Sequence, residues 1–265
     1  MAREAALGAL FASDRRRVLV GLGVIVALAW AYLLYMGWGM EHMDAGAAMS
    51  IMPHMISWNA RDLALVFVMW AIMMAAMMLP SAAPMVLMFA TLNRHRRDHE
   101  QTVVPVSAFV GGYLAIWTAF SGLATFAQWG LLEASLVTPM MASTSDLLGG
   151  GLLIAAGIFQ FTSLKHACLA KCRSPLAFIM TEWRDGTGGA LVMGLRHGAY
   201  CTGCCWLLMA LLFVFGVMNL IWIALLSAFV LIEKLLPRAR WLSPGSGVLL
   251  IAWGVINIAG FGFQV

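Results

Sequence analysis

Long apolar stretches separated by short polar segments make up most of this sequence. A helix needs about 20 mostly apolar residues to cross the hydrocarbon core of a bilayer, and seven stretches come close to that length or exceed it. They are residues 18–39, 63–90, 104–131, 147–164, 189–214, 217–235 and 246–264. The pattern predicts an all-α fold, a polytopic transmembrane helix bundle of about seven spans in a single membrane domain, residues 1–265. Six spans are also compatible with it, if the last stretch only dips into the membrane.

The second stretch is unusually long, and it contains two prolines, Pro80 and Pro84. A proline inside a helix removes a backbone donor and crowds the preceding turn. We therefore expect a kink or a partly unwound segment near Pro80. In lipid, neighbouring helices or a cavity must then satisfy the carbonyls that lose their partners.

The composition supports lipid as the solvent of this chain. Hydrophobic residues make up 62% of the sequence and charged residues only 11%, whereas a soluble domain carries about 25% charged residues. The net charge of +4 does not indicate a nucleic-acid partner, because the basic residues lie at the ends of the apolar stretches, where they orient a membrane protein. The bilayer is therefore the first predicted partner.

Lysine and arginine also predict which side of the membrane each segment faces. If the spans alternate, all but Arg61 and Arg196 of the 16 basic residues fall on one side, and such an excess marks the cytoplasmic side. We expect a cytoplasmic N-terminus, with a basic cytoplasmic segment at residues 1–17, an outer loop at residues 40–62 and a cytoplasmic loop at residues 165–188. The first apolar stretch is longer than the roughly 7–15 residues of a signal peptide core, which predicts an uncleaved anchor.

The segment RHGAYCTGCCWLLM places soft metal ligands inside the fifth apolar stretch. At about 100° per residue, one histidine and three cysteines fall within an arc of about 120° on one helix face. They are His197, Cys201, Cys204 and Cys205. One straight helix cannot bring all four to one ion, because the first and last lie about 12 Å apart along its axis. A metal site would combine two of them with a donor from another helix; alternatively, the cysteines pack as small apolar residues.

Two further cysteines, Cys168 and Cys172, follow the fourth apolar stretch and lie four residues apart, on one face of a helical turn. The neighbouring basic residues Lys165, Lys171 and Arg173 favour thiolates there, and a reducing cytosol disfavours a disulfide. We expect a metal-exchange site that faces the cytosol. It would be separate from the intramembrane site unless this loop folds back into the bundle; the alternative is a loop whose cysteines have no role.

Methionine supplies the third set of soft donors, with 20 residues in the chain. Met69, Met73 and Met77 follow one another at helical spacing in the second stretch, and the expected outer loop carries further methionines with His42 and His54. Thioether and imidazole groups bind copper, so Met73 and Met77 are candidate ligands. Core packing of the helix, and an amphipathic interfacial segment for the loop, are the alternatives.

The chemistry of these donors favours copper as Cu(I), with zinc second. A monovalent soft cation also suits a membrane interior, because one thiolate neutralises it. We expect the charged pair Glu233 and Lys234 to mark the end of the sixth stretch, without a chemical role.

Three segments resemble a bacterial family of predicted metal-binding integral membrane proteins, some of them described as copper chaperones. The matching pieces are MWAIMMAAMMLPSAAPM (69–85), LKHACLAKCRSP (164–175) and HGAYCTGCCWLLMALLFVFGVMNLIWIALLSAFVLIEKLLP (197–237). The resemblance implies a multi-pass protein of the bacterial inner membrane that handles metal, with a cuproenzyme or a copper carrier as its partner.

Three hypotheses of function follow. The first is a membrane-embedded copper-binding protein that acts in copper handling or delivery, with His197, the five cysteines and the second-stretch methionines as ligands. The second is a membrane thiol-disulfide oxidoreductase, because CTGC has the spacing of redox-active cysteine pairs. The third is an accessory or assembly subunit of a larger membrane complex. The sequence has no phosphate-binding loop, so we do not expect this chain alone to pump a metal with ATP. Whether the protein is an enzyme stays open, with a non-enzymatic role favoured, and the sequence does not predict the oligomeric state.

Overall fold

The computed structural model describes residues 2–41, 58–98, 104–134, 146–236 and 241–261. The described residues form helices joined by short connections, which confirms the all-α fold. The helices are α1 (Ala2–Glu41), α3 (Ala60–Asp98), α4 (Val106–Glu133), α5 (Asp146–Phe159), α6 (Ser163–Arg173), α7 (Pro175–Glu182), α8 (Gly186–Ala210), α9 (Leu212–Phe215), α10 (Leu220–Leu235), α11 (Leu242–Ile256) and the π-helical turn η1 (Asn257–Phe261).

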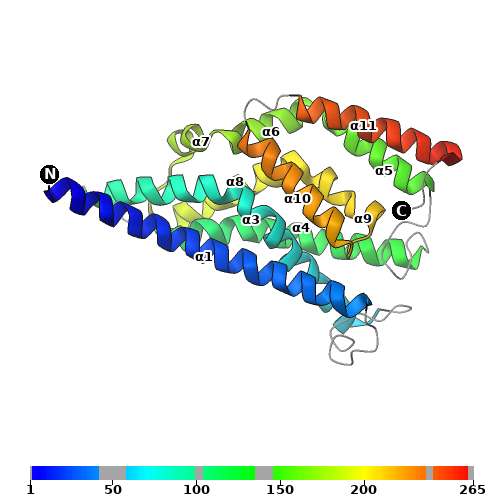
Figure 1. The fold of residues 1–265 in the computed structure, drawn as a ribbon, viewed down its shortest axis with the longest axis horizontal. Helices are drawn as coiled ribbons and strands as arrows, with labels where there is room; N and C mark the ends of the chain where they lie inside the picture. Colours follow the sequence, from blue (N-terminus) through cyan, green and yellow to red (C-terminus); the bar gives the residue numbers. More distant parts are fainter. Residues whose placement is uncertain (1, 42–57, 99–103, 135–145, 237–240, 262–265) are drawn as a thin grey trace.

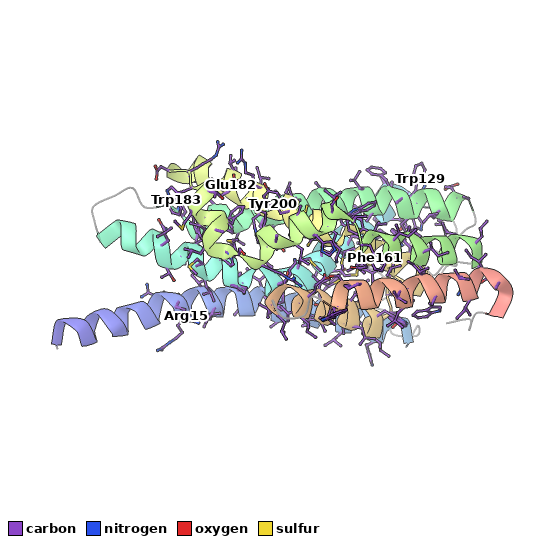
Figure 2. All side chains as sticks on the ribbon, turned by 90° about the horizontal axis from the view of Figure 1, so that it is seen from above. Arg15, Trp129, Phe161, Glu182, Trp183 and Tyr200 are labelled. Atoms are coloured by element: carbon purple, nitrogen blue, oxygen red, sulfur yellow. The ribbon has the colours of Figure 1, made fainter. Side chains whose placement is uncertain are left out.

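The helices form an elongated bundle in which α1 runs along one edge and the pair α5 and α11 along the other (Figure 1). Figure 2 shows Arg15 and Trp183 towards one end of the long axis and Trp129 towards the other. The N-terminal basic segment and the end of α7 therefore lie in the same half of the bundle. The predicted cytoplasmic orientation of that half stays a prediction.

Within the described residues, five segments are long and apolar enough to cross a membrane, and the bent pair α5–α6 raises the number to six. The five segments are Arg15–Gly39, Ala60–Asn93, Val106–Glu133, Gly186–Phe215 and Leu242–Gly260. Six spans, our alternative, agree with this number, and a seventh is not shown in the described residues because α10 has only 16 residues, about 24 Å of helix. It is short because Gly216 breaks the chain with a φ of 90° and Asn219 caps the new helix.

Helix α3 is continuous through both of its prolines, Pro80 and Pro84. The segment is therefore not unwound, contrary to one of our two expectations for it. A side chain from a neighbouring helix does reach the backbone of the turn before Pro80: Ser227 of α10 donates to the carbonyl of Met77 at 3.3 Å. Helix α3 thus contacts α10 one residue after Ala76, whose carbonyl loses its helical donor to Pro80.

The segment expected as a cytoplasmic loop, residues 165–188, contains the helices α6 and α7 instead. Helix α6 starts after a short break behind α5, where the Thr162 side chain caps the backbone N–H of Lys165. The two helices meet at a bend of 64°, and this bend carries α6 against α8. The loop therefore folds back into the bundle.

Helices α4 and α8 make the most extensive helix–helix contact among the described residues. Their backbones touch at glycines: a Cβ added at Gly112 would collide with the backbone of α8 at Leu191, and one added at Gly194 would collide with that of α4 at Phe109. This close approach of two backbones is typical of membrane helices. It fixes the depth and rotation of the α8 turns that follow Gly194, which carry the histidine and cysteines.

Most of the expected outer Met/His loop, residues 42–57, lies outside the described residues.

Candidate metal centre

Four thiols from two helices form one cluster, which we call the thiol cluster: Cys172 of α6 and Cys201, Cys204 and Cys205 of α8. The three α8 residues are at most 1% exposed. Cys172 is partly exposed as a residue, but its thiol turns inward and interacts with the sulfurs of Cys201 and Cys204. A second helix therefore brings a soft donor to the cysteines of α8.

The α8 cysteines are held on one face by their own backbone. The thiols of Cys204 and Cys205 each donate to the carbonyl of Cys201 at 3.0 Å. Because both thiols point back to the same turn, the three sulfurs gather around Cys201. The one-face arrangement read from the sequence spacing agrees with these contacts.

A lysine from α10 reaches this cluster. The ammonium nitrogen of Lys234 lies 2.8 Å from the sulfur of Cys201 and 3.1 Å from the hydroxyl oxygen of Ser81. Lys234 is 6% exposed. The hydroxyl of Tyr113 lies 3.1 Å from the same sulfur and donates to the carbonyl of Met78 at 3.0 Å. Groups of α4, α6 and α10 thus contact the Cys201 sulfur directly. Ser81 of α3 reaches it through Lys234.

A buried ion pair lies beside the cluster. Lys165 and Glu233 are both 0% exposed and their charged groups lie 2.8 Å apart, while Lys165 also donates to the carbonyl of Cys204 at 3.3 Å. Ser243 of α11 donates to the second carboxylate oxygen of Glu233. A buried ion pair is expensive in a membrane and indicates a functional region.

These contacts correct two of our expectations. Lys165 does not lie on a solvated loop, because the bend between α5 and α6 carries it into the core. Glu233 and Lys234 do not simply end a span at the interface, because both side chains turn into the bundle and find partners there.

His197 lies one helical turn before Cys201 and is 2% exposed. Its ring is enclosed by aromatic rings, with centroids 6.0 Å from Phe109, 5.6 Å from Tyr113 and 5.5 Å from Phe178. Among the described residues, none bonds to its Nδ1. Since buried polar atoms are nearly always paired, this nitrogen is free to take a ligand.

Cys168 faces a different part of α8 from the thiol cluster. A Cβ added at Gly203 would lie 2.9 Å from its sulfur, and Cys168 is partly exposed. It therefore lies at the margin of the site, close enough to Cys204 to interact with it electrostatically.

The two candidate methionines, Met73 and Met77, are fully buried on α3. Met77 is four residues before Ser81 and shares its helix face, and Ser81 contacts Lys234. The methionine row of α3 therefore ends one turn before Ser81, which reaches the thiol cluster through Lys234.

In the part of the chain that the structure describes, no three histidine, cysteine, aspartate or glutamate side chains are already arranged around a common metal position. The thiols instead bond to a backbone carbonyl and to one another. For Cys204 or Cys205 to join as a ligand, its thiol would have to give up the hydrogen bond to the Cys201 carbonyl.

The sequence profile described as "PpoB2: Copper chaperone" matches residues 67–257. This range covers most of the chain and contains the whole thiol cluster. The chain belongs to the PpoB2 copper chaperone family. No curated protein and no solved structure matches the chain. Family membership confirms the resemblance read from the three sequence segments, and it identifies copper as the metal of this family.

Sequence reasoning missed two groups of this copper chaperone family member that contact the cluster, Lys234 and Tyr113, and it missed Ser81, which contacts Lys234. Lys234 carried a usable signal, because it is a charged residue at the end of a long apolar segment of the most specific motif. Tyr113 and Ser81 carried none, because their contacts depend on how the helices pack.

Proposed function

We propose that this protein binds Cu(I) inside its helix bundle and passes it to a partner, a cuproenzyme or a copper carrier, at the bacterial inner membrane. The observation that supports this most is the approach of the Cys172 thiol, from α6, to the sulfurs of Cys201 and Cys204 on α8. Soft thiolates select Cu(I), with Zn(II) as the second choice. Copper is the cargo of this site.

Cys172 and Cys201 are the proposed first pair of ligands, because they belong to different helices and already interact. Cys204 and Cys205 are the reserve donors, since each sulfur lies on the same face within a turn of Cys201. The unpaired Nδ1 of His197 is a further donor one turn away. Several donors around one position would allow copper to be exchanged between ligands without leaving the protein.

The route to and from the cluster follows the remaining soft donors. Met69, Met73 and Met77 are each at most 1% exposed and follow one another by about 6 Å along α3. They would bring Cu(I) from the outer side towards Cys201. The partly exposed Cys168 would serve as the exchange point on the cytoplasmic side.

The test is the copper content of the purified protein from copper-replete cells. Wild type is expected to hold about one copper per chain, and C172S and C201S are each expected to lose most of it, because each removes one of the paired thiolates. The matched control is T202V on the same turn of α8, which should keep its copper. A wild-type protein without copper, or cysteine variants that retain it, would overturn the proposal.

A further inference from the structure

Lys234 is a buried cation whose close partners are a sulfur and a hydroxyl. Its nitrogen lies 2.8 Å from the Cys201 sulfur and 3.1 Å from the Ser81 oxygen. In the described segments, no carboxylate lies within ion-pairing distance of this nitrogen. Its chain neighbour Glu233 pairs with Lys165 instead. Because a lone charge in a membrane interior is costly, the sulfur of Cys201 is the group placed to become the counter-ion of Lys234 once it binds a metal as a thiolate.

The neighbouring charges do not change this assignment. Lys165 and Glu233 form an ion pair at 2.8 Å, so together they add no net charge beside the cluster. Among the described side chains that contact a sulfur of the thiol cluster, Lys234 is the one that carries a positive charge.

We propose that Lys234 balances the charge of the metal–thiolate complex and thereby selects a monovalent soft cation over a divalent one. The inference rests on the proposed function, because it concerns the same sulfurs. Lys234 is a positioning residue: its nitrogen holds the Cys201 sulfur and does not bind the metal.

The selection follows from counting charges. When a thiol binds the metal, it loses its proton to water. On any one set of sulfurs, the Cu(I) complex is then one charge unit more negative than the Zn(II) complex. Two thiolates with Cu(I) carry one negative charge, which Lys234 neutralises, whereas two thiolates with Zn(II) are already neutral. Because charges interact strongly where water is scarce, an ammonium next to Cys201 favours the Cu(I) complex.

The experiment measures the affinities of the purified full-length protein for Cu(I) and for Zn(II), each by competition with a chromophoric chelator of known affinity. K234M removes the charge and keeps the length of the side chain, and it is expected to weaken Cu(I) binding by at least about tenfold relative to Zn(II). K234R keeps the charge and should restore the wild-type ratio of the two affinities. A loss of packing alone would not be rescued in this way.

The matched control is K171M, the same substitution at a lysine of α6 next to Cys172. Lys171 has no described contact with a cluster sulfur, and its removal should change the ratio less than about threefold, as for a screened charge. A folded K234M with the wild-type ratio would overturn the inference. So would a K171M with the same effect as K234M.

A second measurement covers variants that fail to fold. In an experimental structure of the copper-loaded wild type, the Lys234 nitrogen should remain within hydrogen-bonding distance of a metal-bound sulfur; a Lys234 side chain turned away from the sulfurs would overturn the inference. The two proposals fail differently. A wild type that binds no copper contradicts the proposed function, whereas thiol-bound copper with an unchanged K234M contradicts only the role of Lys234.

Discussion

Cys201 is the residue at which the contacts of the site meet. Its sulfur is close to a cation, a phenol and a second thiol, and its carbonyl accepts from the two cysteines that follow it on α8. Structural cysteines in apolar cores need none of these polar neighbours. A packing role alone therefore does not account for the surroundings of Cys201.

A second single residue, His197, gives a testable prediction. In H197F, a phenyl ring replaces the imidazole among Phe109, Tyr113 and Phe178, where an aromatic side chain packs well. We expect the thermal stability in detergent to stay within a few degrees of wild type or to rise, because a buried unpaired nitrogen is removed. Cu(I) affinity should fall by about tenfold if Nδ1 is a ligand.

Stability and affinity must be measured on the same sample of H197F. An unchanged Cu(I) affinity would show that the histidine only packs. A marked loss of stability would instead show that Nδ1 already has a partner in the folded protein.

At the scale of elements, the site depends on two helices being brought to α8. The bend of 64° between α5 and α6 carries Cys172 inward, and the Lys165–Glu233 pair joins α6 to α10. Ser243 adds α11 to this connection through its hydrogen bond to Glu233. The ion pair therefore fixes the helices that carry Cys172 and Lys234 relative to each other, beside α8.

The α4–α8 contact yields a prediction with a neighbouring control. G112A would place a methyl group against the α8 backbone, whereas the space around Gly111 is open within 4 Å. We expect G112A to lose about 1–3 kcal/mol of unfolding free energy, because two packed backbones cannot separate without disturbing the core. G111A should be nearly neutral.

Thermal unfolding in detergent compares the two alanine variants directly. Equal melting temperatures for G111A and G112A would contradict the close α4–α8 packing. We also expect G112A to bind copper more weakly, since it moves the turns that carry His197 and Cys201.

Apolar patterning predicted the elements better than it predicted their ends and bends. The stretch 189–214 corresponds to α8, Gly186–Ala210, because a long run of apolar residues identifies a membrane helix on its own. The gap between the stretches 189–214 and 217–235 matches the break at Gly216, but the pattern did not show that α10 begins only at Leu220, after the Asn219 cap. The Thr162 cap that starts α6 has a recognisable sequence signal, but the direction of the bend depends on packing.

At the scale of the whole molecule, the sequence allowed us to predict the cysteines of the site. It did not allow us to predict the charged side chains that surround them. The spacing of Cys201, Cys204 and Cys205 places them on one face by helix geometry alone. That Cys172 and Lys234 would meet them depends on three-dimensional contacts between α6, α8 and α10, which no local pattern encodes. We expected two separate cysteine sites if the segment 165–188 stayed outside the bundle. That segment instead forms helices, and α6 packs against α8.

The central claim is that thiolates of α6 and α8 together hold Cu(I). Copper K-edge X-ray absorption of the copper-loaded wild type tests it most directly. The account predicts a Cu(I) edge with sulfur as the dominant ligand, and a loss of sulfur scattering in C172S as well as in C201S. A spectrum with only nitrogen or oxygen ligands, or a sulfur shell that survives both substitutions, would contradict it.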